Sequence, residues 1–383
     1  MQKNNAMASF NFLNKKWSWA STFGFPWGSM DVSDQDKKVD IKGKWDGARV
    51  HRMLQPAGIT SFSATVKVGA PKTTYVVTAN AGGVGSGKRV QDVGTSCGLN
   101  KDIVKANVMG RLQVATNASS TPVIANAQRQ ILCDHLYSYG GRSVSIFEMG
   151  FAGMKMIADT GSELEASTAR ANKAHFNDPT GAAGGFDSTS GTTGTAPVSV
   201  VTGMVGTNRL LFAGLKVPSG VFMYDVTMPT NPRMLDFHNH RNWTDKSWKV
   251  QVSSDGQKID GPTSAYTGKQ MDVCADQIVF VHATESPICA PIVIVGNGDS
   301  GSVSIYKVQV TPKPRALSSD LSCNWGTCPD LAKSPMTADQ VCNCGKGKCG
   351  VPSSAKLLTD AERLSKACKY FKKTNGVCSS TGR

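Results

Sequence analysis

The sequence lacks several features that identify common classes of protein. It contains no run of about eighteen apolar residues, so no transmembrane helix is predicted. Residues 1–28 contain no apolar stretch typical of a signal peptide and no clear small-residue cleavage site. Aromatic residues make up only 7% of the chain, whereas 39 of its 383 residues are glycine. This composition favours many turns and short strands over a bundle of helices.

Acidic residues are scarce relative to basic ones. The chain has 28 Asp and Glu residues against 42 Lys and Arg residues, which gives a formal net charge of +14. The basic residues are scattered, without a long basic run and without the interleaved aromatic residues of single-strand-binding proteins. We therefore expect no nucleic-acid partner, and an acidic or extracellular-matrix partner instead.

The C-terminal tail lacks histidine and paired Cys-x-x-Cys motifs, which the common zinc sites contain. Seven of the eleven cysteines nevertheless lie in this tail: Cys323, Cys328, Cys342, Cys344, Cys349, Cys368 and Cys378. Such a cluster beside a cysteine-poor body is typical of a disulfide-linked module in an oxidising compartment. A zinc-binding tail is the alternative. The odd total leaves at least one thiol free or paired between two chains.

Short hydrophobic runs separated by glycine and proline dominate the body of the chain. Residues 210–215, 220–226 and 234–237 are three such runs, divided by a Pro-Ser-Gly turn and a turn with two prolines. This spacing predicts a β-meander. We expect an all-β fold, a partial β-propeller of four-stranded blades, although a β-sandwich gives similar spacing. Residues 359–371 predict a short helix inside the cysteine-rich tail.

One short helix is expected in the body, at residues 163–172. Ser162 is placed as its N-cap, with Glu165 three positions later as in a capping box. Upstream, residues 135–149 predict strands bent around Gly140 and Gly141. Arg142, beside these glycines, either reaches an anion or hydrogen-bonds the carbonyl groups of a neighbouring loop.

Asp31, Asp34 and Asp36 place three carboxylates within six residues. Such a loop provides hard oxygen ligands for calcium, although it lacks the glycine and the closing glutamate of an EF-hand. A solvated turn, in which the aspartates accept backbone N–H bonds, is the alternative. His238 and His240 lie two residues apart at a strand end, where they either bind a metal or serve as surface residues.

Two further motifs depend on context. The glycine-rich loop at residues 80–88 ends in lysine, but an arginine follows and no amphipathic helix opens there, so it is not a phosphate-binding loop. Asn117 and Asn242 begin glycosylation sequons, which matter only if the chain is secreted.

Taken in order, several short motifs resemble the choice-of-anchor I β-propeller family. They are residues 31–36 (DVSDQD), 55–56 (QP), 75–80 (YVVTAN), 136–146 (LYSYGGRSVSI), 159–162 (DTGS), 176–177 (FN), 185–188 (GFDS), 220–226 (GVFMYDV), 231–232 (NP), 239–241 (NHR) and 300–306 (SGSVSIY). That family includes mesenchyme-specific cell-surface glycoproteins of biomineralising animals and secreted bacterial proteins, some labelled alkaline-phosphatase-like. The resemblance implies a division into an aromatic N-terminal segment (1–29), a partial propeller (30–312) and the cysteine-rich tail (318–383).

The chain departs from the family in two ways. The resemblance starts midway through the family's domain, so we expect an N-terminally incomplete chain whose signal peptide is missing. Most acidic loop residues of the family pattern are also replaced, for example at residues 80–83 (NAGG) and 55–57 (QPA). The candidate calcium ligands that remain are Asp31, Asp34, Asp36, Asp276 and Asp299.

These observations predict a non-catalytic extracellular or cell-surface module that binds matrix, glycan, mineral or protein. No cofactor is assigned except possible calcium. The first alternative is a metal-dependent phosphatase or phosphoesterase, by analogy with some relatives' label. The second is an intracellular protein with a zinc-binding tail.

Overall fold

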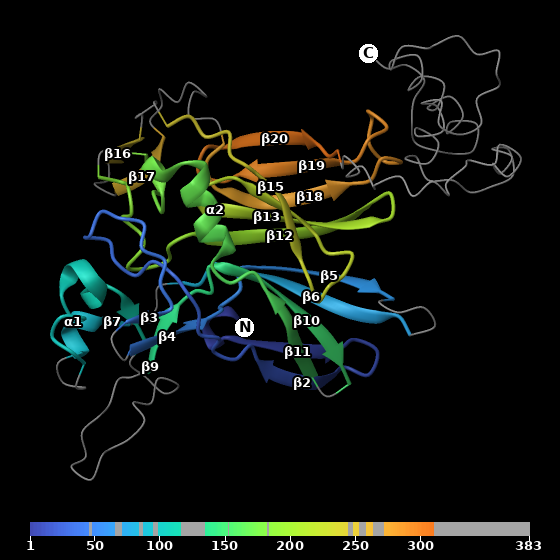
Figure 1. Cartoon of the computed structure of the whole chain (residues 1–383). Coiled ribbons are helices and arrows are strands. Elements are labelled where there is room, and N and C mark those ends of the chain that lie inside the picture. Colours follow the sequence, from blue (N-terminus) through green and yellow to red (C-terminus); the bar gives the residue numbers. More distant parts are fainter. Residues whose placement is uncertain are drawn as a thin grey trace, which may run out of the picture. The chain divides into compact units, whose positions relative to one another are not determined.

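The fold is built mostly of strands. A computed structural model describes residues 1–45, 48–65, 71–83, 87–94, 99–115, 135–151, 153–181, 184–243, 248–252, 258–262 and 272–309. Figure 1 shows these residues arranged in several separate β-sheets with few helices. The expected all-β class is confirmed. The cysteine-rich tail and Asn117 lie outside the described residues.

In the described part of the chain, the strands form six sheets. Two sheets are four-stranded. The first has the order β11-β10-β6-β5 and consists of β5 (Gly58–Ala64), β6 (Thr73–Asn80), β10 (Ser143–Gly150) and β11 (Gly153–Asp159). The second has the order β12-β13-β14-β15 and consists of β12 (Ala196–Val205), β13 (Asn208–Val217), β14 (Val221–Asp225) and β15 (Arg233–His238). A five-stranded sheet has the order β3-β4-β9-β8-β7, made of β3 (Lys44–Trp45), β4 (Ala48–Met53), β7 (Lys88–Arg89), β8 (Gln113–Val114) and β9 (His135–Tyr139). The smaller sheets are β1 (Ala6–Asn11) with β2 (Lys16–Thr22), β16 (Trp248–Val252) with β17 (Lys258–Pro262), and β18 (Ala275–Val281), β19 (Ile292–Asn297) and β20 (Ser302–Lys307).

Helices are short. They are α1 (Val90–Val93), α2 (Glu163–Ala171), the 3-10 turns η1 (Gln2–Asn4) and η4 (Lys173–His175), and the π-helical turn η3 (Ala106–Gly110). In the described part of the chain, no helix is long and apolar enough to cross a membrane.

The chain divides into two compact units. The first comprises Met1–Thr202, Leu211–Ile278 and Val295–Ser304, and the second comprises Gly203–Leu210, Val279–Ile294 and Ile305–Arg383. Within the second unit, the backbone N–H of Val308 donates to the carbonyl of Pro291 at 2.9 Å. The site described in the next section lies within the first unit.

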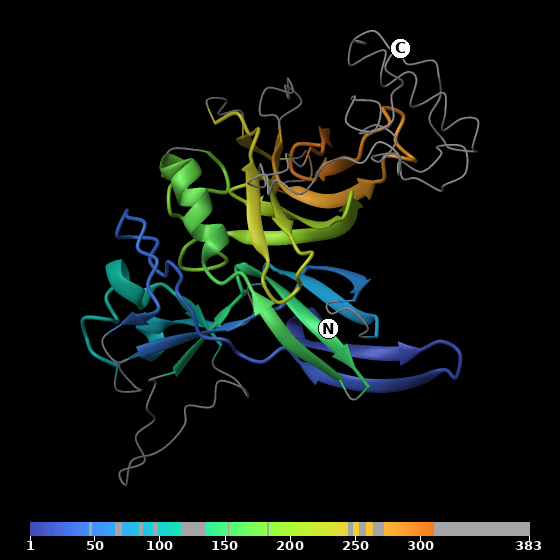
Figure 2. The same cartoon turned by 45° about the vertical axis from the view of Figure 1, so that its right-hand side comes forward.

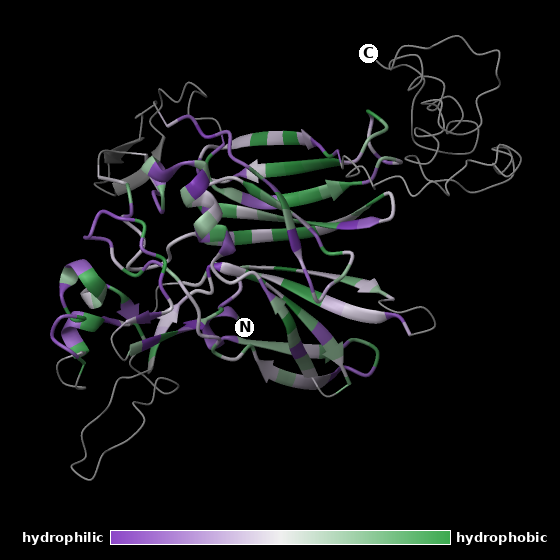
Figure 3. Cartoon of the chain, in the orientation of Figure 1, coloured by the Kyte–Doolittle hydropathy of each residue, from purple (hydrophilic) through white to green (hydrophobic). Residues whose placement is uncertain are grey.

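The main hydrophobic core of the first unit joins residues of both four-stranded sheets. Val77 and Ile146 of the first sheet belong to the same buried cluster as Leu211, Phe222 and Tyr224 of the second. Figure 3 shows that hydrophobic residues alternate with polar ones along many of these strands. Phe222 is fully buried, and its ring stacks on Phe237 with centroids 4.3 Å apart. Burial of these apolar side chains supplies most of the stabilisation of this unit.

The predicted strands at residues 210–215, 220–226 and 234–237 are confirmed as β13, β14 and β15. The helix expected at residues 163–172 is confirmed as α2. The bend at Gly140 is also confirmed, but the flanking strands β9 and β10 belong to different sheets. Gly140 and Arg142 have positive φ angles of 84° and 51°, which turn the backbone sharply between the two sheets.

Residues 1–29, set apart by the sequence as an aromatic segment, contain the antiparallel β1–β2 hairpin, in which Ala6 pairs with Thr22. Figure 2 shows this hairpin as a curved two-stranded ribbon near β11. No closed propeller ring is present among the residues that the structure describes. The second four-stranded sheet has its strands in chain order, which is the arrangement that the sequence predicts.

We predict that Phe222→Ala lowers the free energy of unfolding by about 3–5 kcal/mol, because it leaves a cavity in the core that joins the two sheets. Urea unfolding measures this change. The matched control is Ile59→Ala on β5, whose side chain is 59% exposed and should change stability by no more than about 0.5 kcal/mol. Equal losses for the two variants would show that the core has been assigned wrongly.

Candidate functional site

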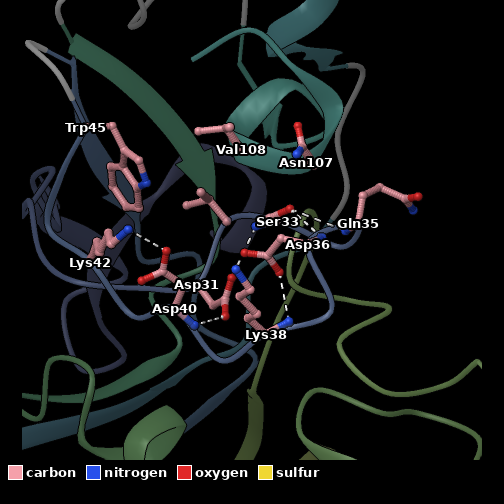
Figure 4. Close-up of a pocket in the computed structure, with 11 residues that line it drawn as sticks. Asp31, Ser33, Gln35, Asp36, Lys38, Asp40, Lys42, Trp45, Asn107 and Val108 are labelled. Carbon is pink, nitrogen blue, oxygen red and sulfur yellow. Dashed lines mark hydrogen bonds and ion pairs between the residues drawn. The ribbon is translucent and has the colours of Figure 1, made fainter. Parts of the chain in front are cut away.

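A polar hollow of the first unit lies at the loop between the β1–β2 hairpin and β3. It has a volume of about 320 Å³. Its lining consists of residues Asp31, Val32, Ser33, Gln35, Asp36, Lys38, Asp40 and Lys42 of the loop, together with Trp45, Asn107 and Val108. Figure 4 shows Asp31, Asp36 and Asp40 pointing toward the same space. We call this feature the acidic pocket.

Asp31 is fully buried at the base of the acidic pocket. Its Oδ1 accepts a hydrogen bond from the N–H of Ser33 at 3.2 Å, and its Oδ2 accepts one from the N–H of Asp40 at 2.7 Å. The carboxylate thus closes the loop on itself. Burial is the main cause that raises the pKa of Asp31 to about 7, and the nearby charge of Glu165 adds to it.

A buried ion pair supports the loop from behind. Arg142 and Glu165 are exposed by only 2% and 1%, and Arg142 Nη1 lies 2.7 Å from Glu165 Oε1. The same nitrogen donates to the carbonyl of Asp31 at 2.5 Å, while Nη2 donates to the carbonyl of Ser190 at 2.6 Å. Glu165 Oε2 accepts the backbone N–H of Asp31 at 3.1 Å. One arginine therefore ties the loop, α2 and the segment before β12 together.

This geometry settles two expectations from the sequence. Arg142 does hydrogen-bond the carbonyl groups of neighbouring loops, as one of its two interpretations stated. The capping-box interpretation of Glu165 is wrong, because Ser162 makes no side-chain capping bond and the Glu165 carboxylate turns inward to Arg142. A buried arginine requires a carboxylate partner, and Glu165 is the one within reach.

Asp187 is neither a candidate ligand from the sequence nor one of the residues that line the acidic pocket, but its carboxyl group interacts with that of Asp36. Its side chain is 1% exposed, and its Oδ1 accepts a hydrogen bond from the hydroxyl of Ser190. Its Oδ2 is buried and has no hydrogen-bond donor, while the carboxyl of Asp36 lies within interaction range. Burial, with a smaller contribution from Asp31 and Asp36, raises the pKa of Asp187 to about 8. The motif at residues 185–188, noted only as a family resemblance, was the signal in the sequence.

The carboxylates named from the sequence do not all meet. Asp31 and Asp36 line the acidic pocket, whereas Asp34 forms an ion pair with Arg111 at 2.5 Å. Asp276 and Asp299 lie elsewhere, near the buried thiol of Cys274. Burial, followed by the charges of Asp299 and Asp276, raises the pKa of this thiol to about 12. Across the described ranges, no three histidine, cysteine or acidic side chains are grouped as ready metal ligands. Asn242, the second sequon, is half-buried.

The negative charges of the acidic pocket are only partly balanced. Lys42 pairs with Asp40 at 2.5 Å, Arg111 pairs with Asp34, and Arg142 pairs with Glu165. Among the ion pairs of the described residues, none involves Asp31, Asp36 or Asp187. Asp31 and Asp36 in the pocket, which Lys38 also lines, and the buried Asp187 near Asp36 therefore have no basic partner in direct contact, an arrangement that a proton or a bound cation would stabilise.

Comparison with known proteins agrees with the resemblance drawn from the sequence. The family model described as "Choice-of-anchor I domain" matches residues 1–229. This match includes residues 1–29 and therefore the β1–β2 hairpin. The chain is also 26% identical over 211 residues to Gigasin-3a of Magallana gigas, an alignment that covers 54% of this chain and 67% of that protein.

We predict that Arg142→Met lowers the free energy of unfolding by about 3–5 kcal/mol, because Glu165 is left as an uncompensated buried charge. Chemical unfolding measures the loss. Combining it with Glu165→Met should cost less than the sum of the two single variants, since the two groups form one ion pair. The control is Arg233→Gln, which removes an exposed pair with Asp225 and should cost about 0–1 kcal/mol. Strict additivity in the double variant would contradict the assignment.

Proposed function

Because the chain belongs to the choice-of-anchor I family, we propose that it is a non-catalytic binding module of the extracellular space or cell surface. Membership of this family indicates an extracellular or surface module. The binding role is inferred from two features of this chain, the acidic pocket and the large positive net charge. We further infer that the two four-stranded sheets are blades of an incomplete propeller.

We propose that the acidic pocket holds a calcium ion. The observation that carries this is the Oδ2 atom of Asp187, which is buried without a donor and within range of the Asp36 carboxyl. Two facing carboxylates repel each other unless a proton or a cation lies between them. Calcium accepts six to eight oxygen ligands in flexible geometry. Asp36 and Asp187 would contribute the first carboxylate oxygens, a small movement of the loop would bring Asp31 to the ion because the three are not grouped beforehand, and loop carbonyls and water would supply the rest.

In this proposal, calcium has a structural role. The loop at residues 31–42 is joined to the rest of the first unit through Asp31, which bonds Glu165 and Arg142, through Asp34, which pairs with Arg111, and through the buried side chain of Val32. An ion bound by Asp31, Asp36 and Asp187 would join this loop to the segment before β12, next to the bonds that Arg142 already makes. Such an ion would fix the shape of the loop on the surface.

The partner of the module is proposed to be acidic. The net charge of +14 attracts polyanions over a range set by the ionic strength. Residues 311–383 contribute half of it, with 12 basic and 5 acidic residues, a net charge of +7. In the described part, the turn of the β1–β2 hairpin exposes Lys15 and Lys16 beside Phe12 and Trp17, which are 86% and 70% exposed. Exposed apolar side chains beside basic ones are typical of a contact surface.

We predict that calcium stabilises the chain against heat, by about 2.7 kcal/mol at a concentration 100 times its Kd. Differential scanning calorimetry in calcium and in a chelator measures this effect. Magnesium should stabilise less, because it requires a stricter geometry and gives up water reluctantly. If calcium leaves the melting temperature of the unaltered chain unchanged, the calcium proposal fails.

Asp187→Asn provides the sharper test. It should abolish the calcium effect, and in a chelator it should leave stability unchanged or higher, because it removes one of two facing buried carboxylates. Asp102→Asn is the matched control, since Asp102 is 75% exposed and pairs only with Lys105 on the surface. A normal calcium response of Asp187→Asn would remove Asp187 from the site.

We also predict retention of the full chain on immobilised heparin, used as a polyanion probe. Retention should persist at about 0.15 M ionic strength and be lost at about 1 M, because salt screens the attraction. An uncharged agarose matrix is the control. Passage of the chain through heparin without delay at low salt would contradict an acidic partner. It would not affect the calcium proposal, which the calcium experiments test separately.

A further inference from the structure

Two histidines at the end of β15 face each other. His238 is the last residue of β15 and pairs with Val221 of β14, and His240 follows two residues later. Residues two apart on an extended chain lie on the same face. The Nε2 atoms of the two imidazoles are in direct contact, with ring centroids 4.0 Å apart and planes at 80°. Two nitrogen atoms that coordinate metals in their neutral form are therefore aimed at one point.

A carboxylate stands behind one of these rings. Asp272 Oδ2 lies 3.8 Å from Nδ1 of His240, which is the nitrogen that points away from His238. Histidines that bind metals commonly donate their other ring N–H to a carboxylate, which fixes the tautomer and orients the ring. Asp272 is placed for that role, either directly or after a small rotation.

Two carboxylates, those of Asp236 and Asp272, also lie close to the pair, and that of Asp272 is within 3.8 Å of the His240 ring. Arg241 is the nearest basic neighbour in the chain, but it is occupied elsewhere. Its guanidinium stacks over Trp243 at 4.2 Å, and its Nη1 donates to the carbonyl of Pro179 at 2.9 Å.

The pair is accessible from solvent. His238 is exposed, and the side chain of His240 is 46% exposed. His238 also lines a hollow of about 290 Å³ with His175, Phe237 and Arg241. An ion can therefore reach the two nitrogens without any rearrangement of the core.

We propose that His238 and His240 form a two-imidazole chelate for a divalent transition metal such as Zn²⁺ or Ni²⁺. Imidazole nitrogen suits these metals, whereas calcium prefers the oxygen ligands of the acidic pocket. A small opening of the two rings makes room for the ion, and water completes its coordination. The site has two protein ligands, in keeping with the lack of any group of three among the described residues. It is independent of the calcium proposal.

The test must separate these histidines from the tail cysteines, which also bind transition metals when they are reduced. The full chain is therefore reduced, alkylated with iodoacetamide, and freed of metal by a chelator before titration with Ni²⁺ in a calorimeter. We expect one equivalent to bind. His238→Gln and His240→Gln should each weaken this binding at least tenfold, and the double variant should be little worse than either single one, because a single imidazole does not chelate.

His282→Gln is the matched control, because His282 is an exposed histidine elsewhere in the chain, directly after β18. It should bind Ni²⁺ as the unaltered chain does. Melting temperatures without metal should be alike for all variants, which separates loss of a ligand from loss of fold. Nitrogen hyperfine splitting from two imidazoles in the Cu²⁺ spectrum would support the chelate directly.

Two results would overturn the proposal. One is that the alkylated chain does not bind Ni²⁺ at all, which would make the contact a plain hydrogen bond between imidazoles. The other is unchanged affinity in both histidine variants, which would place the metal elsewhere. Loss of calcium binding in Asp187→Asn should leave Ni²⁺ binding intact, so the two proposals fail separately.

Discussion

The arrangement of the first unit depends on how a single buried guanidinium is satisfied. Arg142 is removed from water at the bend between β9 and β10, where its positive φ turns the side chain toward the interior. A charge in such a place is tolerated only with a carboxylate and further hydrogen bonds. Glu165 supplies the carboxylate, and the carbonyl groups of Asp31, Ser190 and Thr192 accept bonds from the two terminal nitrogens, while Nε has no partner. Segments far apart in the sequence are thereby held in one place.

The same ion pair explains why the acidic pocket keeps an excess of negative charge. Arg142 lies close to Asp31, but its charge is balanced by Glu165, so it does not neutralise the carboxylates of the loop. Arg111 and Lys42 are likewise engaged by Asp34 and Asp40. What remains around Asp31, Asp36 and Asp187 is a set of oxygen atoms, partly bonded to backbone N–H groups. The buried ion pair therefore positions the loop that forms the pocket, but it does not neutralise the carboxylates of that loop.

The sequence predicted the local elements better than their assembly. Alternation and turn residues located β13, β14, β15 and α2, because these signals depend on neighbouring residues. The sequence did not predict that β9 pairs in parallel with β4 while β10 pairs with β6. Both pairings join residues that are far apart in the sequence. The site shows the same limit. Asp31 and Asp36 were visible as a short-range cluster, but Asp187 reaches them only through the fold, from about 150 residues away. Glu165 had a plausible local role in a cap, and the buried Arg142 overrode it.

An acidic pocket in a chain with a net charge of +14 is not a contradiction, because the surface charge and the charges within the pocket act over different distances. At physiological ionic strength, the field of exposed lysines and arginines decays over about 8 Å, so it governs the approach of a partner and not the occupancy of a buried site. Within the pocket, the local dielectric is low and the nearest groups dominate, which are carboxylates and backbone amides. The imidazole pair at the end of β15 has softer donors and is open to solvent. The two clusters therefore differ in ligand chemistry as well as in exposure, and a hard cation and a transition metal would not compete for the same atoms.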